Sequence, residues 1–138
     1  MRAPLSWLKE FAAIPASLSS QEIADAFIRV GFEVEEIIET GADLTGPLVI
    51  GEVVSIEEIT EFKKPIRFVG LNCGGGRTRF VICGAFNFNV GDLVVVALPG
   101  AVLPGGFAIA KRETYGKISD GMIASSRELG LGDEHAGI

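Results

Sequence analysis

The sequence predicts a mainly β fold, a small five-stranded barrel that follows a short α/β segment. From Leu48 onward, strand-length apolar runs alternate with turn residues, and no long helical pattern interrupts them. Before Leu48, apolar residues recur at helical spacing instead. Residues 40–47, which contain two glycines, an aspartate and a proline, separate the two patterns. We therefore expect an incomplete α/β domain at 1–40 and a barrel domain at 41–138.

The first expected elements belong to residues 1–40. Ser19 and Glu22 fit a capping box at the start of a helix over residues 19–31, and Gly31 fits its C-terminal stop. An earlier helical turn is expected around residues 5–11, and the alternation in residues 32–38 predicts one short strand. A unit of about forty residues is too small to bury much apolar surface alone.

The barrel domain follows the linker. Its expected strands are residues 48–59, 66–73, 77–83, 93–98 and 107–111, with a last short strand near 121–124. Side chains alternate along a strand, so Arg77 and Arg79 share one face of the hairpin, and Thr78, Phe80 and Ile82 share the other. The hairpin tip is therefore cationic on one side and free to be apolar on the other.

Composition narrows the class of protein. Of 138 residues, 48% are hydrophobic and 22% are charged, which argues against disorder. The apolar runs are far shorter than the roughly 20 residues of a membrane helix. Residues 1–11 also lack the apolar core of a signal peptide. We expect a cytoplasmic protein with no membrane partner.

Residues that could carry catalysis or bind metal are scarce. His135 is the sole histidine and has no serine or cysteine partner at a recognisable spacing, so we interpret it as a solvated tail residue. Glycines 74–76 lead into a strand, whereas a dinucleotide-binding loop leads into a helix. Cys73 and Cys83 are interpreted as free thiols, with a disulfide or metal site as the alternative. The sequence predicts no catalytic residue and no metal ligand.

The charge is distributed unevenly. The net charge is −6, yet residues 62–117 hold eight basic and two acidic side chains. Small barrels of the oligonucleotide-binding (OB) type bind RNA with basic grooves and stacking aromatics, which residues 62, 86, 88 and 115 would supply. The alternative is that the cations balance the acidic remainder and the phenylalanines are core. The RNA-binding candidates are Lys63, Lys64, Arg67, Arg77, Arg79, Lys111, Arg112 and Lys117.

Five segments occur in an order that is characteristic of one family. They are "MRAPLSWLKEF", "SSQEIADAFIRVGFEVEEI", "VICGAFN", "GDLVVVALPGAVLPGGFAI" and "SDGMIASSRELGLG". In this order the chain resembles the N-terminal region of the β subunit of bacterial phenylalanine–tRNA ligases. The resemblance implies a tRNA-binding OB-fold domain whose last strand starts at Gly121 and Met122, followed by a helical turn at residues 126–129. Ser125 or Ser126 fits the cap of that turn.

The resemblance has further implications for the site and the assembly. It adds Ser119, Ser125 and Arg127 as RNA contacts. It also implies an assembly of two α and two β subunits that joins phenylalanine to tRNA with ATP and magnesium, its active site in the α subunit. This chain would then be an inactive part of the β subunit without a cofactor of its own. Its partners would be tRNA, the α subunit and the other β-subunit domains.

Two features leave a second function open. The resemblance implies that residues 1–40 are half of a small domain, with exposed apolar surface around Trp7 or Phe27. Residues 60–70 read "TEFKKPIRFVG" where related modules carry a stretch resembling HPNADKL, and Phe86 stands where proline is usual. The alternative function is therefore a structural scaffold or docking domain of the same enzyme without RNA contact.

Overall fold

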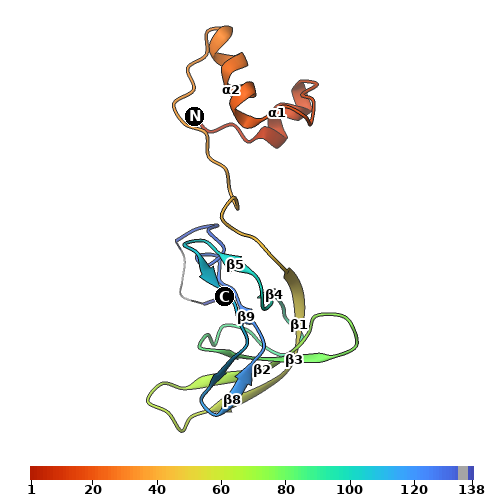
Figure 1. Ribbon diagram of the computed structural model, residues 1–138, viewed down its shortest axis with the longest axis vertical. Helices are drawn as coiled ribbons and strands as arrows, with labels where there is room; N and C mark the ends of the chain where they lie inside the picture. Colours follow the sequence, from red (N-terminus) through yellow and green to blue (C-terminus); the bar gives the residue numbers. More distant parts are fainter. Residues whose placement is uncertain (134–136) are drawn as a thin grey trace. The chain divides into compact units, whose positions relative to one another are not determined.

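The computed structural model describes residues 1–133 and 137–138, and it divides into two compact units, Met1–Glu39 and Thr40–Ile138. Figure 1 shows the helices of the first unit and the strands of the second. No helix in the described part of the chain is long and apolar enough to cross a membrane. His135 lies outside the described residues.

The first unit contains helices α1 (Leu5–Phe11) and α2 (Ser20–Arg29). The predicted capping box is confirmed, because Ser19 Oγ accepts from Glu22 N at 3.3 Å and Glu22 Oε2 accepts from Ser19 N at 2.8 Å. Gly31 follows α2 with φ +95°, the left-handed conformation that suits a helix stop.

The strand predicted at residues 32–38 is absent, so this expectation was wrong. A strand needs a neighbour that accepts its backbone hydrogen bonds. Within residues 1–39, all of which are described, no other segment is extended into a strand. Only Ala24 of this unit is buried, while Trp7 is 62% and Phe11 90% exposed. The unit as it stands has almost no core.

The second unit is the expected barrel. Its strands β1 (Leu48–Ile59), β2 (Ile66–Asn72), β3 (Thr78–Cys83), β4 (Leu93–Ala97) and β9 (Met122–Ile123) form one antiparallel sheet in the order β3-β2-β1-β4-β9. The long strand β1 pairs with both β2 and β4, and an irregularity between Val53 and Ser55 marks a β-bulge. This curled sheet confirms the predicted mainly β, five-stranded fold.

Two hydrogen bonds close the sheet on itself. The amide of Asp120 donates to the carbonyl of Phe80 at 2.8 Å. The amide of Ile82 donates to Ser119 Oγ at 3.0 Å, so a side chain takes the place of a backbone acceptor. The edge of β3 is thereby joined to the segment that enters β9.

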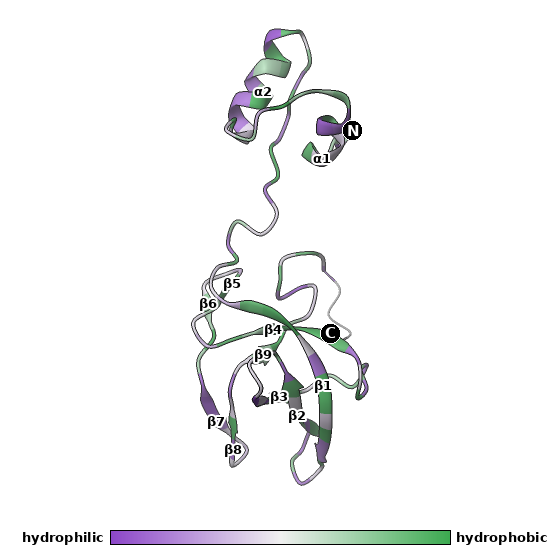
Figure 2. Cartoon of the chain, turned by 90° about the vertical axis from the view of Figure 1, so that its right-hand side faces the viewer, coloured by the Kyte–Doolittle hydropathy of each residue, from purple (hydrophilic) through white to green (hydrophobic). Residues whose placement is uncertain are grey.

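The barrel interior is mostly aliphatic. Val53, Val69, Leu71, Val81 and Val96 are fully buried and come from four neighbouring strands. Burying each such side chain contributes about 1.5–3 kcal/mol. Figure 2 shows hydrophobic colour along the central strands and hydrophilic colour on β7. A second buried cluster, around Leu103, extends the core into the later part of the chain.

The strand predicted at residues 107–111 was wrong in extent. Instead, β5 (Val102–Leu103) pairs with β6 (Phe107–Ala108), and β7 (Arg112–Thr114) pairs with β8 (Lys117–Ser119). Tyr115 and Gly116 connect β7 to β8 with φ values of +55° and +71°. Positive φ at both central residues defines a tight hairpin turn. Tyrosine seldom adopts this conformation, so propensity does not predict the hairpin.

Candidate nucleic-acid interface

The hairpin arginines lie on one face, as predicted. Arg79 Nη1 lies 2.7 Å and Arg77 Nη2 3.5 Å from the same oxygen, Asp120 Oδ2. The Arg79 side chain is 24% exposed, whereas that of Arg77 is 71% exposed. Arg79 thus serves the closure of the barrel, and Arg77 keeps most of its guanidinium in solvent.

Arg67 is held inside the unit. Its Nη1 donates to the carbonyl of Phe88 at 2.8 Å, and its Nη2 lies 3.1 Å from Glu58 Oε1. The guanidinium carbon lies 4.6 Å from the Phe86 ring centroid and 5.3 Å from that of Phe88. With 12% of its side chain exposed, Arg67 fastens residues 84–92 to the barrel. Its charge is therefore committed to internal contacts.

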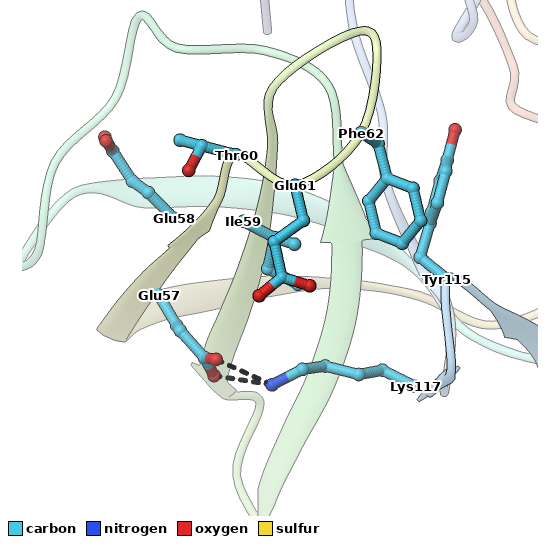
Figure 3. A pocket seen from close by; sticks show the side chains of 8 residues that line it. All are labelled: Glu57, Glu58, Ile59, Thr60, Glu61, Phe62, Tyr115 and Lys117. Carbon is cyan, nitrogen blue, oxygen red and sulfur yellow. Dashed lines mark hydrogen bonds and ion pairs between the residues drawn. The ribbon is translucent and has the colours of Figure 1, made fainter.

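Lys117 also has an internal partner. Its Nζ lies 2.8 and 2.7 Å from the two carboxylate oxygens of Glu57. The same ammonium lies 4.4 Å from the centroid of the Phe68 ring. Figure 3 shows this ion pair at one side of a shallow pocket. Lys117 therefore contacts an aromatic ring and a carboxylate at the same time.

Two pairs of aromatic side chains lie near Lys117. The Phe68 and Phe80 rings stack with centroids 5.1 Å apart and planes at 16°. Phe62, from the loop between β1 and β2, meets Tyr115 of the β7–β8 turn at 4.6 Å. In OB folds, the face of the second and third strands and its flanking loops bind oligonucleotides. We name the side chains of Phe62, Phe68, Phe80, Tyr115 and Lys117 the aromatic face.

The pocket at this face has a volume of about 200 Å³. Figure 3 shows its lining: Glu57, Glu58, Ile59, Thr60, Glu61, Phe62, Tyr115 and Lys117. Three carboxylates outnumber one ammonium among these residues, so the pocket itself disfavours phosphate. Cations outside the pocket are not subject to this repulsion, and a phosphate at Lys117 would have to displace Glu57.

Other predicted RNA-binding cations form fewer contacts within the chain. Lys63 and Lys64 lie exposed in the loop between β1 and β2, and neither has an ion pair with a described residue. Lys111 and Arg127 are likewise exposed and form no ion pair within the described part of the chain. The Arg112 guanidinium carbon lies 5.6 Å from the ring centroid of Phe107.

The two predicted serines have structural roles. Ser119 Oγ accepts from Ile82 N and donates to the carbonyl of Gly121 at 3.0 Å. Ser125 is 7% exposed, and its Oγ donates to Glu128 Oε2 at 2.8 Å. Ser125, and not Ser126, thus caps the turn before Leu129, which is itself buried.

The sequence analysis did not identify Phe68 as a surface aromatic residue. It counted Phe88 among the aromatic residues that would stack on RNA. Phe88 is 3% exposed and belongs to the core. A signal for Phe68 existed in the strand alternation, because Phe68 lies on the face opposite Val69, which is fully buried. The contact between Phe68 and Lys117 joins distant segments and leaves no local signal.

Comparison with known proteins gives two results. The family model described as "Putative tRNA binding domain" matches residues 48–138. The whole chain is similar to phenylalanine–tRNA ligase β subunits, with 58% identity to that of Thermobifida fusca and 56% to that of Mycolicibacterium paratuberculosis, each over 100% of the chain. Identity to the Streptomyces avermitilis protein is 53% over 99% of the chain. The chain spans 17% of the length of each of these relatives.

Proposed function

Because the chain belongs to the tRNA-binding domain family through residues 48–138, we propose that it is an accessory tRNA-binding module of a phenylalanine–tRNA ligase β subunit. The observation that carries this proposal is the family match over the whole barrel. The physical support is the pair Lys63 and Lys64, which lie exposed beside the aromatic face. Exposed lysines can bind the phosphates of an RNA strand, and neighbouring aromatic rings can stack on its bases.

The proposed role places catalysis elsewhere in the assembly. The full enzyme would join phenylalanine to tRNA with ATP and magnesium in the cytoplasm, as an assembly of two α and two β subunits. We assign neither cofactor to this chain. Glycines 74–76 connect β2 to β3 and begin no helix. The described residues include no group of three or more acidic, histidine or cysteine side chains that could hold a metal ion. We derive no catalytic step from its residues.

The first unit has a different part in the proposal. Trp7, Phe11 and Phe32 are each more than half exposed in Met1–Glu39, and such a set of apolar side chains marks a contact surface. We take residues 1–40 as an incomplete small domain. Other β-subunit sequence would cover these side chains.

A second function is favoured by the ion pairs. Arg67, Arg79 and Lys117 all bind carboxylates of this chain, and the net charge is −6. A domain whose cations form ion pairs within the same chain has few charges left for RNA. Such a domain suits a scaffold or docking site for other ligase domains. Under that alternative the barrel makes no contact with tRNA.

A charge series separates the two functions. The double variant Lys63→Gln/Lys64→Gln removes the two exposed loop cations, and Lys9→Gln/Arg29→Gln removes the same charge from the helices of the first unit. We expect the loop variant alone to weaken tRNA binding, and to reduce the slope of log K against log salt by about 1.5, as the loss of two phosphate contacts implies. Equal effects of the two variants would favour the scaffold.

A further inference from the structure

The rings of Phe68 and Phe80 form a fixed stack on the outward side of β2 and β3. Their neighbours Val69 and Val81 point into the core with no exposed surface, so the two rings point outward. Phe80 lies opposite Gly70 in the pairing of β2 with β3. A side chain at Gly70 would come within 3.2 Å of the Phe80 ring and would collide with Ser55. The absence of a side chain at Gly70 thus leaves room for the Phe80 ring.

The two ends of this stack differ. The ammonium of Lys117 lies 4.4 Å from the centroid of the Phe68 ring and is paired with Glu57. Phe80 is 42% exposed, and its recorded ring contact within the described residues is Phe68. One ring of the stack, Phe68, therefore has a cation beside it, and the other ring, Phe80, is partly open to solvent.

We propose that the Phe80 ring is a stacking site for one unpaired nucleobase, with Lys117 positioned to bind the phosphate of a neighbouring nucleotide. This inference rests on the proposed tRNA-binding function. Stacking on an aromatic ring suits any base, because every base has a π face. It requires an unpaired base, since both faces of a base within a helix are already covered. The ligand class is single-stranded or loop RNA.

Glu57 has a defined part in this site. Its two oxygens occupy the ammonium of Lys117 at 2.7 and 2.8 Å, as a phosphate would. Glu57 and an incoming phosphate therefore compete for the same donor. Removing the carboxylate frees Lys117 and removes a like charge from the path of the phosphate. Glu57→Gln is expected to bind single-stranded RNA more tightly than the parent chain.

The test uses the 138-residue chain and a single-stranded RNA 12-mer that carries one 2-aminopurine. Stacking on a ring quenches 2-aminopurine fluorescence. Phe80→Leu is expected to lose the quenching and on the order of fivefold or more in affinity for the 12-mer, with an unchanged salt slope. Its matched control is Phe107→Leu, which alters a ring that is 48% exposed on β6.

The charge arm uses Glu57→Gln beside Glu52→Gln, which removes the same charge from an exposed position of β1. Only Glu57→Gln is expected to raise affinity for the 12-mer. This arm decides the proposal if Phe80→Leu fails to fold. Unchanged quenching and affinity in a folded Phe80→Leu chain, or equal effects of the two glutamate variants, would overturn the stacking site.

The outcomes also separate this site from the proposed function. If the parent chain binds tRNA with a steep salt dependence while Phe80→Leu and Glu57→Gln behave like their controls, the stacking site is wrong and the tRNA-binding function stands. If the parent chain binds neither tRNA nor the 12-mer, both are wrong. If Phe80→Leu loses the quenching of 2-aminopurine fluorescence and Phe107→Leu keeps it, the result supports both the stacking site and the tRNA-binding function.

Discussion

Arg79 of β3 lies 2.7 Å from Asp120, the residue two positions before β9, and this ion pair joins the two ends of the barrel sheet. The backbone amide of Asp120 also donates to Phe80 at 2.8 Å, so one residue fastens the seam twice. A predicted RNA-binding arginine is thus also a closure residue. Cations that hold the fold, such as Arg79, are therefore distinct from cations that remain exposed, such as Arg77.

Arg79→Gln is expected to destabilise the barrel. It leaves the Asp120 carboxylate, 18% exposed, without its nearer partner, which costs about 1–3 kcal/mol of the free energy of unfolding. Arg77→Gln removes the distant and 71% exposed partner and is expected to cost less than about 1 kcal/mol. Urea unfolding of both variants measures the difference. Equal losses would show that Arg79 does not hold the seam.

Arg67→Gln is expected to lower the free energy of unfolding and to leave the salt dependence of tRNA binding unchanged. The change removes the donor to the Phe88 carbonyl and the partner of Glu58, at a cost of about 1–3 kcal/mol in the free energy of unfolding. Because the side chain is only 12% exposed, the salt slope of tRNA binding should stay unchanged. A flatter slope in a folded variant would show that Arg67 reaches phosphate.

Ser125→Ala removes the cap of the turn that follows β9. Ser125 and Glu128 form a reciprocal pair, with Ser125 N donating to Glu128 Oε2 at 2.7 Å. Loss of the hydroxyl should cost about 1 kcal/mol in the free energy of unfolding. Ser126→Ala is the matched control, because the adjacent Ser126 side chain is exposed and has no recorded hydrogen bond within the described residues. Thermal unfolding should distinguish them.

The Cys83 thiol should resist ionisation. Burial raises its pKa above the ordinary value, and no disulfide involves it. The raised folded pKa means that the thiol favours the fold below its unfolded pKa, and that this contribution is lost as pH rises through the folded pKa. In a Cys73→Ser background, alkylation of Cys83 should accelerate only at a higher pH than in urea. Coincident pH profiles would contradict this.

Sequence patterns were sufficient for the elements that depend on local chemistry. The Ser19–Glu22 capping box and the ranges of the four long barrel strands could be read directly, because caps and alternation are local signals. The failures have non-local causes. Residues 32–38 have a strand pattern without a pairing partner, and the β7–β8 hairpin turns at a tyrosine with φ +55°.

The candidate site was predictable only in part. Basic residues in the middle of the chain could be counted, but which of them are free could not. Arg67 and Lys117 find partners 9 and 60 residues away, and such pairs depend on how the strands are arranged. The stack of Phe68 on Phe80 likewise needs the register of β2 with β3. Tertiary pairing therefore decides which predicted contacts remain available to RNA.

The proposed function requires this barrel to contact tRNA. Its most direct test is the affinity of the purified chain for a tRNA transcript at about 50 to 200 mM salt, the range over which phosphate contacts change affinity most visibly. We predict binding at low salt with a steep, linear loss of log K as log salt rises. The absence of binding at 50 mM salt, from a chain shown by circular dichroism to be folded, would contradict the account and leave the barrel as a scaffold.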